Sequence, residues 1–402
     1  MKNQYETHDG TFNSAGNPGA GGTSFPALES WGWDPDWERA AGLDAAADGK
    51  APAAPGGLLP ARVIRHVHHS YELVTAPAGA RIQAEVSGAF AYRAATPSDY
   101  PTAGDWILFE AGTGRIQQIL TRRGAVSRTT AGEQSLEQVI TANIDVLFLV
   151  FGLDGGRNFT AGMLERSLVA AWNSGARPVV VLNKVDCADE EHVERTRLEA
   201  EANAPGVAIH LVSALRGDGL AELMGEAPPG TTIGMLGKSG VGKSALLNAL
   251  AKLGGDGGES DGAAQVARVG ELRRGDLQGR HTTTDKQLYL LPSGAILADV
   301  PGLRELQLWA EPGELSDAFP EIEKLGRECR FSDCSHAGEP GCRVQEALAS
   351  GELPQERFER YLDYQKELDY LARRRDQRAR AENERKWKMI AQEARRIKKG
   401  RK

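Results

Sequence analysis

The sequence predicts a multidomain α/β protein in which a small β-barrel precedes a doubly wound sheet and a Cys/His module with helices follows it. Three observations predict this order: short β-rich runs up to about residue 130, apolar runs alternating with helical stretches from about 138, and a Cys/His cluster at 329–342. We expect a disordered extension over 1–58, the barrel over 59–133, the sheet domain over 134–308, the Cys/His module over 309–370 and a basic helical tail over 371–402.

Composition favours a cytoplasmic protein. The 402 residues carry a net charge of −7, and 41% of them are hydrophobic. No apolar run reaches the roughly 18 residues of a membrane span, and the run Val146–Leu153 is much shorter. The N-terminus has no apolar signal core, and three of the four cysteines cluster around a histidine. We therefore expect no membrane association, and a metal site in a reducing compartment rather than a disulfide framework.

The first 58 residues are rich in Gly, Ala, Ser, Pro and acidic residues, which predicts disorder. One exception is open, because Trp31, Trp33 and Trp37 lie close together. They either form a short helix that docks on the next domain or belong to a loosely ordered tail.

Five short β-rich runs separated by turn residues predict a barrel of the OB-fold type. The runs are Ala61–Val67, Tyr71–Thr75, Arg81–Ser87, Asp105–Glu110 and Arg115–Leu120. Such barrels often bind nucleic acid. Arg122, Arg123 and Arg128 follow the last run, and they either reach phosphates or form a solvated basic loop.

Continuous apolar runs between helical stretches predict a parallel sheet that is covered on both faces. The runs are Val146–Phe151, Pro178–Leu182, Ala208–Val212, Thr231–Leu236 and Ala295–Ala298.

A phosphate-binding loop follows the fourth of these runs. Residues 237–244 match the pattern G-x-x-x-x-G-K-[ST] between the strand and a helix over Ala245–Leu253, which is the context that the motif requires. The expected nucleotide contacts are Gly237, Lys238, Ser239, Gly240, Val241, Gly242, Lys243, Ser244 and Ala245. Backbone N–H groups and the helix N-terminus hold the phosphates, Lys243 bridges the β- and γ-phosphates, and Ser244 ligates Mg²⁺.

The base is selected by a second motif, Asn183-Lys184-Val185-Asp186, at the end of the apolar run Pro178–Leu182. A carboxylate at Asp186 accepts hydrogen bonds from both N1–H and N2–H of guanine, and adenine offers no such pair of donors. Ser213, Ala214 and Leu215 follow the next strand, where their backbone would contact the guanine O6. The ligand is therefore predicted to be GTP or GDP.

Two further segments read as the mobile switches of a GTPase. Asp299 ends the run Ala295–Ala298 and fits the second Mg²⁺ position, and the Gly302 amide would sense the γ-phosphate. In the run over 279–284, Thr283 or Thr284 would complete the Mg²⁺ shell; the triplet 282–284 does not decide which, and Thr283 is taken as the Mg²⁺ ligand. Leu303 follows Gly302, where many GTPases have a glutamine that orients water, so intrinsic hydrolysis should be slow.

Another group must then orient the attacking water. His281 is the candidate, although a structural role for this side chain remains open.

The order of the motifs is circularly permuted, because base recognition precedes the phosphate loop and both switches. Chain termini usually lie close together at the surface, so such a permutation can preserve the sheet. With these motifs, the barrel, Ala142–Asp145 and the cysteine cluster, residues 59 to 370 resemble the ribosome small subunit-dependent GTPase family. The resemblance implies GTP hydrolysis stimulated by the 30S subunit, late small-subunit maturation and binding to 16S rRNA.

The cluster Cys329, Cys334, His336 and Cys342 offers three thiolates and one imidazole. Four such ligands suit one structural Zn²⁺ ion, since a full protein shell leaves no position for a substrate. Free thiols around a chance histidine are the alternative.

Residues 371–402 carry 14 Lys and Arg against 4 Asp and Glu, a net charge of +10 that predicts nucleic-acid contact.

Alternatives to a monomeric ribosome-assembly GTPase remain. They are a GTP-switched RNA adaptor without significant turnover, an ATPase or kinase, which the base motif argues against, and a permuted GTPase of the large subunit, which the barrel and the cysteine cluster argue against.

Overall fold

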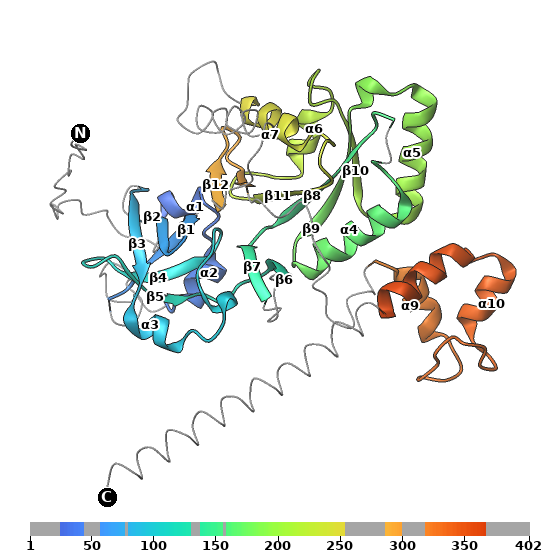
Figure 1. Cartoon of the computed structure of the whole chain (residues 1–402), viewed down its shortest axis with the longest axis horizontal. Coiled ribbons are helices and arrows are strands. Elements are labelled where there is room, and N and C mark those ends of the chain that lie inside the picture. Colours follow the sequence, from blue (N-terminus) through green and yellow to red (C-terminus); the bar gives the residue numbers. More distant parts are fainter. Residues whose placement is uncertain are drawn as a thin grey trace, which may run out of the picture.

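A closed barrel and a helix-covered sheet stand side by side in the computed structural model of this chain (Figure 1). The structure describes residues 25–43, 57–76, 79–129, 137–155, 158–253, 286–299 and 318–366. One sheet runs through both parts in the strand order β10-β9-β8-β11-β13-β12-β1-β2-β3-β5-β4. None of the helices in these ranges is both long and apolar enough to cross a membrane.

The barrel contains the five predicted strands. They are β1 (Leu59–Val67), β2 (Ser70–Thr75), β3 (Arg81–Val86), β4 (Trp106–Glu110) and β5 (Arg115–Ile119). The pairing of β1 with β4 closes the ring, and β3 and β5 form its one parallel pair. Alternating side chains such as Val63, Leu73 and Ile107 fill its interior. The predicted five-stranded, OB-like barrel is confirmed. The short helix α3 (Gly88–Arg93) and the 3₁₀ turn η1 (Pro97–Asp99) lie between β3 and β4.

A two-stranded hairpin that the sequence analysis did not anticipate links the barrel to the sheet. It consists of β6 (Ala125–Thr129) and β7 (Glu137–Ala142). Gly104 needs a positive φ of +97° here, and a Cβ on it would lie 2.0 Å from the carbonyl oxygen of Ala142. The hairpin therefore packs directly against the barrel backbone.

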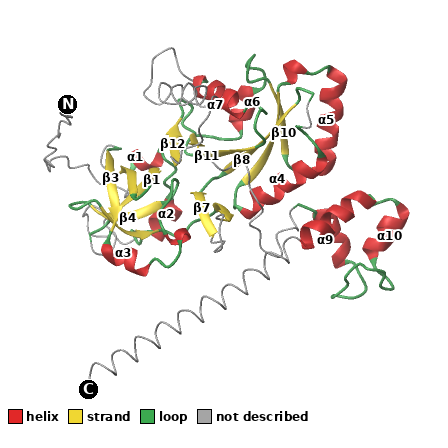
Figure 2. Cartoon of the chain, viewed as in Figure 1, coloured by secondary structure: helices red, strands yellow, loops and turns green. Residues whose placement is uncertain are grey.

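The second part is the predicted doubly wound sheet (Figure 2). Its parallel strands are β8 (Val146–Gly152), β9 (Arg177–Asn183), β10 (Ala208–Val212), β11 (Thr232–Leu236) and β13 (Ile296–Asp299), and β12 (Lys286–Leu290) pairs antiparallel to β13. Side chains of β8 alternate between two cores: Leu147 and Leu149 pack under α4 (Ala161–Asn173) and α5 (Glu190–Asn203), while Phe148 packs under α6 (Leu220–Gly225) and α7 (Lys243–Lys252).

The N-terminal tryptophans pack in the interior. Residues 25–43 form α1 (Pro26–Glu29) and α2 (Pro35–Ala40), and Trp31, Trp33 and Trp37 are each 5% exposed or less. Trp33 meets Trp106 of the barrel edge-on, with 4.8 Å between the ring centroids. The disorder predicted for 1–58 is therefore wrong for 25–43, because large aromatic rings find a tertiary partner that composition does not reveal. The docked-helix alternative is correct for this segment.

Arg122 and Arg123 both bind carboxylates within the fold. Arg122 makes two hydrogen bonds to the fully buried Asp105, of 2.7 and 2.8 Å. Arg123 binds Asp34 of the N-terminal segment at 2.6 Å and lies 4.1 Å over the Trp37 ring. The fully buried Asp105 holds Arg122 inside the fold, so the predicted phosphate contact is corrected for Arg122. Arg123 is 41% exposed, and its contact with nucleic acid stays a prediction. The side chain of Arg128 lies outside the described residues.

The Cys/His module packs on α4. It contains α9 (Pro320–Arg327), α10 (Arg343–Ser350) and a helical segment over 355–366. Phe319, Phe358 and Tyr361 form its core together with Val169 of α4. Glu165 of α4 is fully buried and binds Arg357 and Arg360, each at 2.6 Å. An internal ion cluster thus fixes the module to the sheet domain.

Candidate nucleotide and metal sites

The phosphate-binding motif lies in the turn between β11 and α7. A Cβ on Gly237 would approach the carbonyl oxygen of Val150 to 2.3 Å, so only glycine lets the turn pass this close to β8. Gly242 has φ of +98° and caps α7, whose first residue is Lys243. The first turn of α7 carries backbone N–H groups without an intrahelical acceptor, and such a helix N-terminus can bind anions.

Lys243 folds back over this turn. Its Nζ donates to the carbonyl oxygen of Lys238 at 2.6 Å and also to that of Gly237. Ser244 stands next to it in the first turn of α7. The amine and the hydroxyl predicted to contact phosphate and Mg²⁺ are therefore neighbours at one helix end.

Asn183 ties the base motif to the phosphate loop. This side chain, 1% exposed at the end of β9, donates from Nδ2 to the carbonyl oxygen of Val241 at 3.0 Å. Its Oδ1 accepts from the backbone N–H of Ala214 at 3.2 Å. One amide thus brings the three predicted segments, 183–186, 213–215 and 237–244, to the same edge of the sheet, where open α/β sheets bind ligands.

Asp186 is oriented by Ser213. The Ser213 hydroxyl donates to Oδ1 of Asp186 at 2.6 Å and accepts from the Arg216 N–H at 3.0 Å. This hydrogen bond holds the pKa of Asp186 below its ordinary value, so the carboxylate is ionised and accepts hydrogen bonds at neutral pH. Val185 lies beside it in the turn η2 (Val185–Cys187), and Leu215 is 84% exposed at the same edge.

The switch residues are largely outside the described part of the chain. Asp299 ends β13 beside the phosphate-loop strand β11, at the edge where the other motifs meet. The candidates His281, Thr283, Thr284 and Gly302 lie outside the described residues, as does Leu303.

Sequence reasoning missed Asp154 in the loop after β8. Its carboxylate forms an ion pair with Nζ of Lys184, and Lys184 also donates to the carbonyl oxygen of Gly240 at 2.6 Å. Its position in the sequence could have indicated it, because Asp154 is the first polar residue after a buried strand, at the sheet edge where ligands bind.

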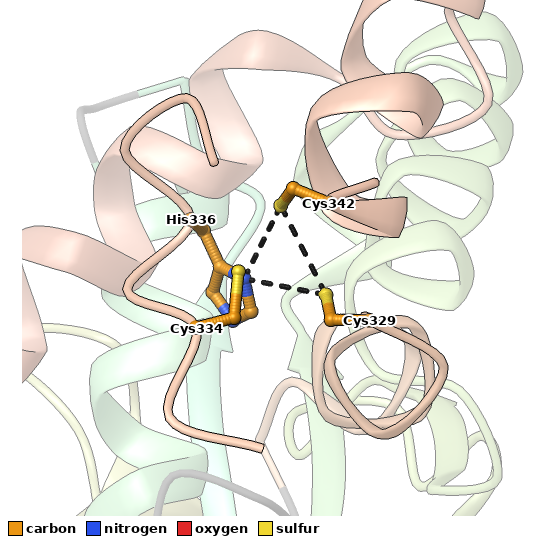
Figure 3. Close-up of side chains that lie close together, drawn as sticks. All are labelled: Cys329, Cys334, His336 and Cys342. Atoms are coloured by element: carbon orange, nitrogen blue, oxygen red, sulfur yellow. Dashed lines mark hydrogen bonds between the residues drawn. The ribbon is translucent and has the colours of Figure 1, made fainter. Parts of the chain in front are cut away.

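Four side chains of the Cys/His module point toward one another (Figure 3). The ligand atoms of Cys329, Cys334, His336 and Cys342 all lie within 4.8 Å of one another. Nδ1 of His336 is 3.6 Å from Sγ of Cys329 and 3.5 Å from Sγ of Cys342, and these two sulfurs are 3.9 Å apart. His336 has a φ of +60°, and its carbonyl oxygen accepts from Nε2 of Gln345 at 2.6 Å. These four side chains are a ligand set that could hold one metal ion.

Comparisons with known proteins agree with this arrangement. A family model described as RsgA GTPase matches residues 119–309. A protein of Opitutus terrae named small ribosomal subunit biogenesis GTPase RsgA is 40% identical over 91% of this chain and 96% of its own length. A protein of the same name from Streptomyces avermitilis is 38% identical over 92% of this chain and 94% of its own length.

Two solved structures share the architecture. YjeQ from Thermotoga maritima is 28% identical and aligns with a TM-score of 0.57 over 77% of this chain and 98% of its own. YloQ, described as a circularly permuted GTPase, is 23% identical and aligns with a TM-score of 0.56 over 78% of this chain and 96% of its own. At this identity the match supports the permuted fold alone. The resemblance drawn from the motifs is confirmed: this chain belongs to the RsgA family of GTPases.

Proposed function

We propose that this chain hydrolyses GTP when stimulated by the 30S subunit and acts in the cytoplasm as a monomer in late maturation of the small ribosomal subunit. Its RsgA relatives are named for small ribosomal subunit biogenesis. The convergence of three motif segments on Asn183 supports the nucleotide chemistry most strongly, because it joins a guanine-selecting carboxylate to a phosphate loop.

The proposed roles follow from chemistry at that edge. Asp186 accepts from guanine, Lys243 and the first turn of α7 hold the β- and γ-phosphates, and Ser244 ligates Mg²⁺. Thr283 would supply a second Mg²⁺ ligand, Asp299 a water-mediated one, and Gly302 an amide toward the γ-phosphate. The magnesium ion supplies charge neutralisation at the phosphates.

RNA contact is proposed for the barrel, the Cys/His module and the basic tail 371–402, with 16S rRNA as the partner. Arg122 and Arg123 already bind Asp105 and Asp34 within the fold, so further basic residues should contribute to phosphate contact. Phosphate contacts from the tail make binding fall as salt rises.

Co-sedimentation with purified 30S and 50S subunits tests this function, with GDP and with a non-hydrolysable GTP analogue. We expect GTP-dependent binding to 30S alone and GTPase turnover that rises when 30S is added. A chain lacking 371–402 should bind 30S more weakly while its GDP affinity stays unchanged. Binding to 30S without any turnover would favour the alternative of a GTP-switched RNA adaptor. That alternative is worth testing because Leu303 stands where many GTPases have glutamine. Binding to 50S alone would contradict the proposal.

His281→Ala is expected to slow single-turnover GTP hydrolysis on 30S particles by about 10²-fold, the lower end of what a positioned acid–base group contributes. Binding of the GTP analogue should change less than twofold. Rapid-quench measurement of the hydrolysed fraction gives the rate. An unchanged rate removes His281 from the mechanism.

The metal of the Cys/His cluster is proposed to be one structural Zn²⁺ ion. Tetrahedral zinc with Zn–S bonds of about 2.3 Å and Zn–N bonds of about 2.0 Å places sulfurs about 3.8 Å apart and sulfur and nitrogen about 3.5 Å apart. The observed 3.9 Å and 3.5–3.6 Å support that ion.

Cys342→Ser is expected to remove about one equivalent of zinc per chain and to unfold residues 318–366, because structural zinc contributes directly to folding. GDP binding should stay within about twofold, since the nucleotide edge lies on other elements. Metal content by mass spectrometry and amide hydrogen exchange provide the measurement. Cys187→Ser, the same replacement at an exposed cysteine outside the cluster, should keep its zinc. Full zinc retention by Cys342→Ser would contradict the assignment.

A further inference from the structure

Asp154 lies outside every recognised motif and yet contacts the base-recognition loop. It stands in the loop between β8 and α4, and its Oδ2 forms an ion pair with Nζ of Lys184. The Asp154 side chain is 31% exposed and that of Lys184 is 25% exposed. The same Nζ donates to the carbonyl oxygen of Gly240 in the phosphate loop at 2.6 Å. The ammonium group therefore joins three loops.

Lys184 is held in an unusual backbone conformation. Its φ of +67° lies in the left-handed region, which a non-glycine residue adopts rarely. Its stem passes close to the phosphate loop, since a Cβ built on Gly242 would lie 3.6 Å from Cε of Lys184. The side chain thus spans from the base motif to the phosphate loop, and its ammonium end fixes the distance between them.

The carboxylate of Asp154 is itself held in place. Its Oδ1 accepts from Nδ2 of Asn158 at 2.9 Å. A Cβ on Gly152 would lie 3.0 Å from that Oδ1 and 3.3 Å from Cα of Val241. Glycine at position 152 therefore lets the loop that carries Asp154 lie close to the phosphate loop. The hydrogen bond from Lys184 holds the pKa of Asp154 below its ordinary value. Asp154 is therefore a charged, oriented partner at neutral pH.

We propose that Asp154 is a positioning residue for guanine-nucleotide binding. By holding Lys184 against Gly240, it sets the base-recognition loop and the phosphate loop at the spacing that one nucleotide requires. Without the Asp154 carboxylate, the Lys184 ammonium keeps the Gly240 carbonyl oxygen as an acceptor, and its four-carbon side chain is less restrained. The two loops must then be ordered when the nucleotide binds, which costs free energy. This inference rests on the proposed nucleotide site.

Asp154→Asn should raise the Kd for fluorescent GDP by about 5- to 20-fold. That change lies between the value of an exposed ion pair and the lower end of the range for a hydrogen bond to a charged group, because the pair is about one-third exposed. The kcat at saturating GTP should stay within about twofold while KM rises, since the chemical step does not involve Asp154. Asp189→Asn is the matched control: it removes the same charge near the same edge, and asparagine still caps α5, where Oδ1 of Asp189 accepts from the His192 N–H. This control should change Kd by less than twofold.

A double-mutant cycle separates positioning through Lys184 from any general effect. Lys184→Met alone should raise Kd at least as much as Asp154→Asn, and adding Asp154→Asn to Lys184→Met should cause no further increase. An unchanged Kd in Asp154→Asn, or an equal loss in the Lys184→Met background, overturns the inference. Failure of the nucleotide site itself gives a different result, since the unaltered chain would then bind GDP no better than ADP.

Discussion

Asp186→Asn is expected to weaken GDP binding by about 10³- to 10⁴-fold. The ionised carboxylate of Asp186 is oriented by Ser213 and offers acceptors for the paired N1–H and N2–H donors of guanine. An amide in its place offers one acceptor and one donor, so a guanine donor is left opposite a donor. Sites built on such hydrogen bonds discriminate by about 10⁴- to 10⁵-fold when a partner is missing.

The same substitution predicts a change of preference. Xanthine has a carbonyl at C2, which can accept a hydrogen bond from the amide introduced at position 186, so xanthosine diphosphate should bind the variant better than GDP does. Competition titrations with GDP, xanthosine diphosphate and ADP measure the order of affinities. Asp189→Asn, three residues further on, should leave all three affinities unchanged. If Asp186→Asn kept its preference for GDP, Asp186 would not recognise the base.

Glu165→Gln is expected to destabilise the contact between α4 and the Cys/His module by about 3–5 kcal/mol. Glu165 is fully buried and accepts from Arg357 and Arg360, and Arg357 is itself 5% exposed. Arg357 also binds Glu321 at 2.7 Å and the carbonyl oxygen of Ala318 at 2.8 Å, so it cannot turn to solvent. Neutralising Glu165 therefore leaves one excess positive charge shared by the buried Arg357, which still binds Glu321, and Arg360, whose side chain is 29% exposed.

Amide hydrogen exchange can localise this loss. At about 1.4 kcal/mol per tenfold change, protection in residues 318–366 should fall by about 10²- to 4 × 10³-fold, while protection of β8 stays unchanged. Glu194→Gln on α5 is the control, because the Glu194 side chain is 56% exposed and such surface pairs contribute less than about 1 kcal/mol. Equal protection in Glu165→Gln and the unaltered chain would mean that hydrophobic contacts alone hold the module.

The sheet strands and the nucleotide motifs could be predicted from the sequence because their signals are local. The run Val146–Phe151 is apolar on every residue since both faces of β8 are buried, and β8 extends over Val146–Gly152. The phosphate loop needs glycine at 237 and 242 because a Cβ would meet Val150 or Asn183. The four metal-site residues also lie within fourteen positions of the chain, so their association does not depend on the remote fold.

Other features depend on partners that are distant in the sequence. Trp33 packs on Trp106, and Arg123 is bound by Asp34. A sequence window around any one of these residues contains only half of the interaction. This is why the composition of residues 25–43 predicts a disordered tail, and why the sequence around Arg122 and Arg123 predicts a basic surface. Asp154 and its partner Lys184 are likewise thirty residues apart, and neither Asp154 nor its neighbours match a motif.

We propose that one edge of the sheet binds guanine nucleotides through Asp186 and the phosphate loop. Equilibrium competition of ATP against fluorescent GTP on the purified chain with Mg²⁺ tests it most directly. We predict that ATP fails to displace GTP even at about 10³-fold excess. Displacement by ATP at concentrations comparable to GTP would contradict the account.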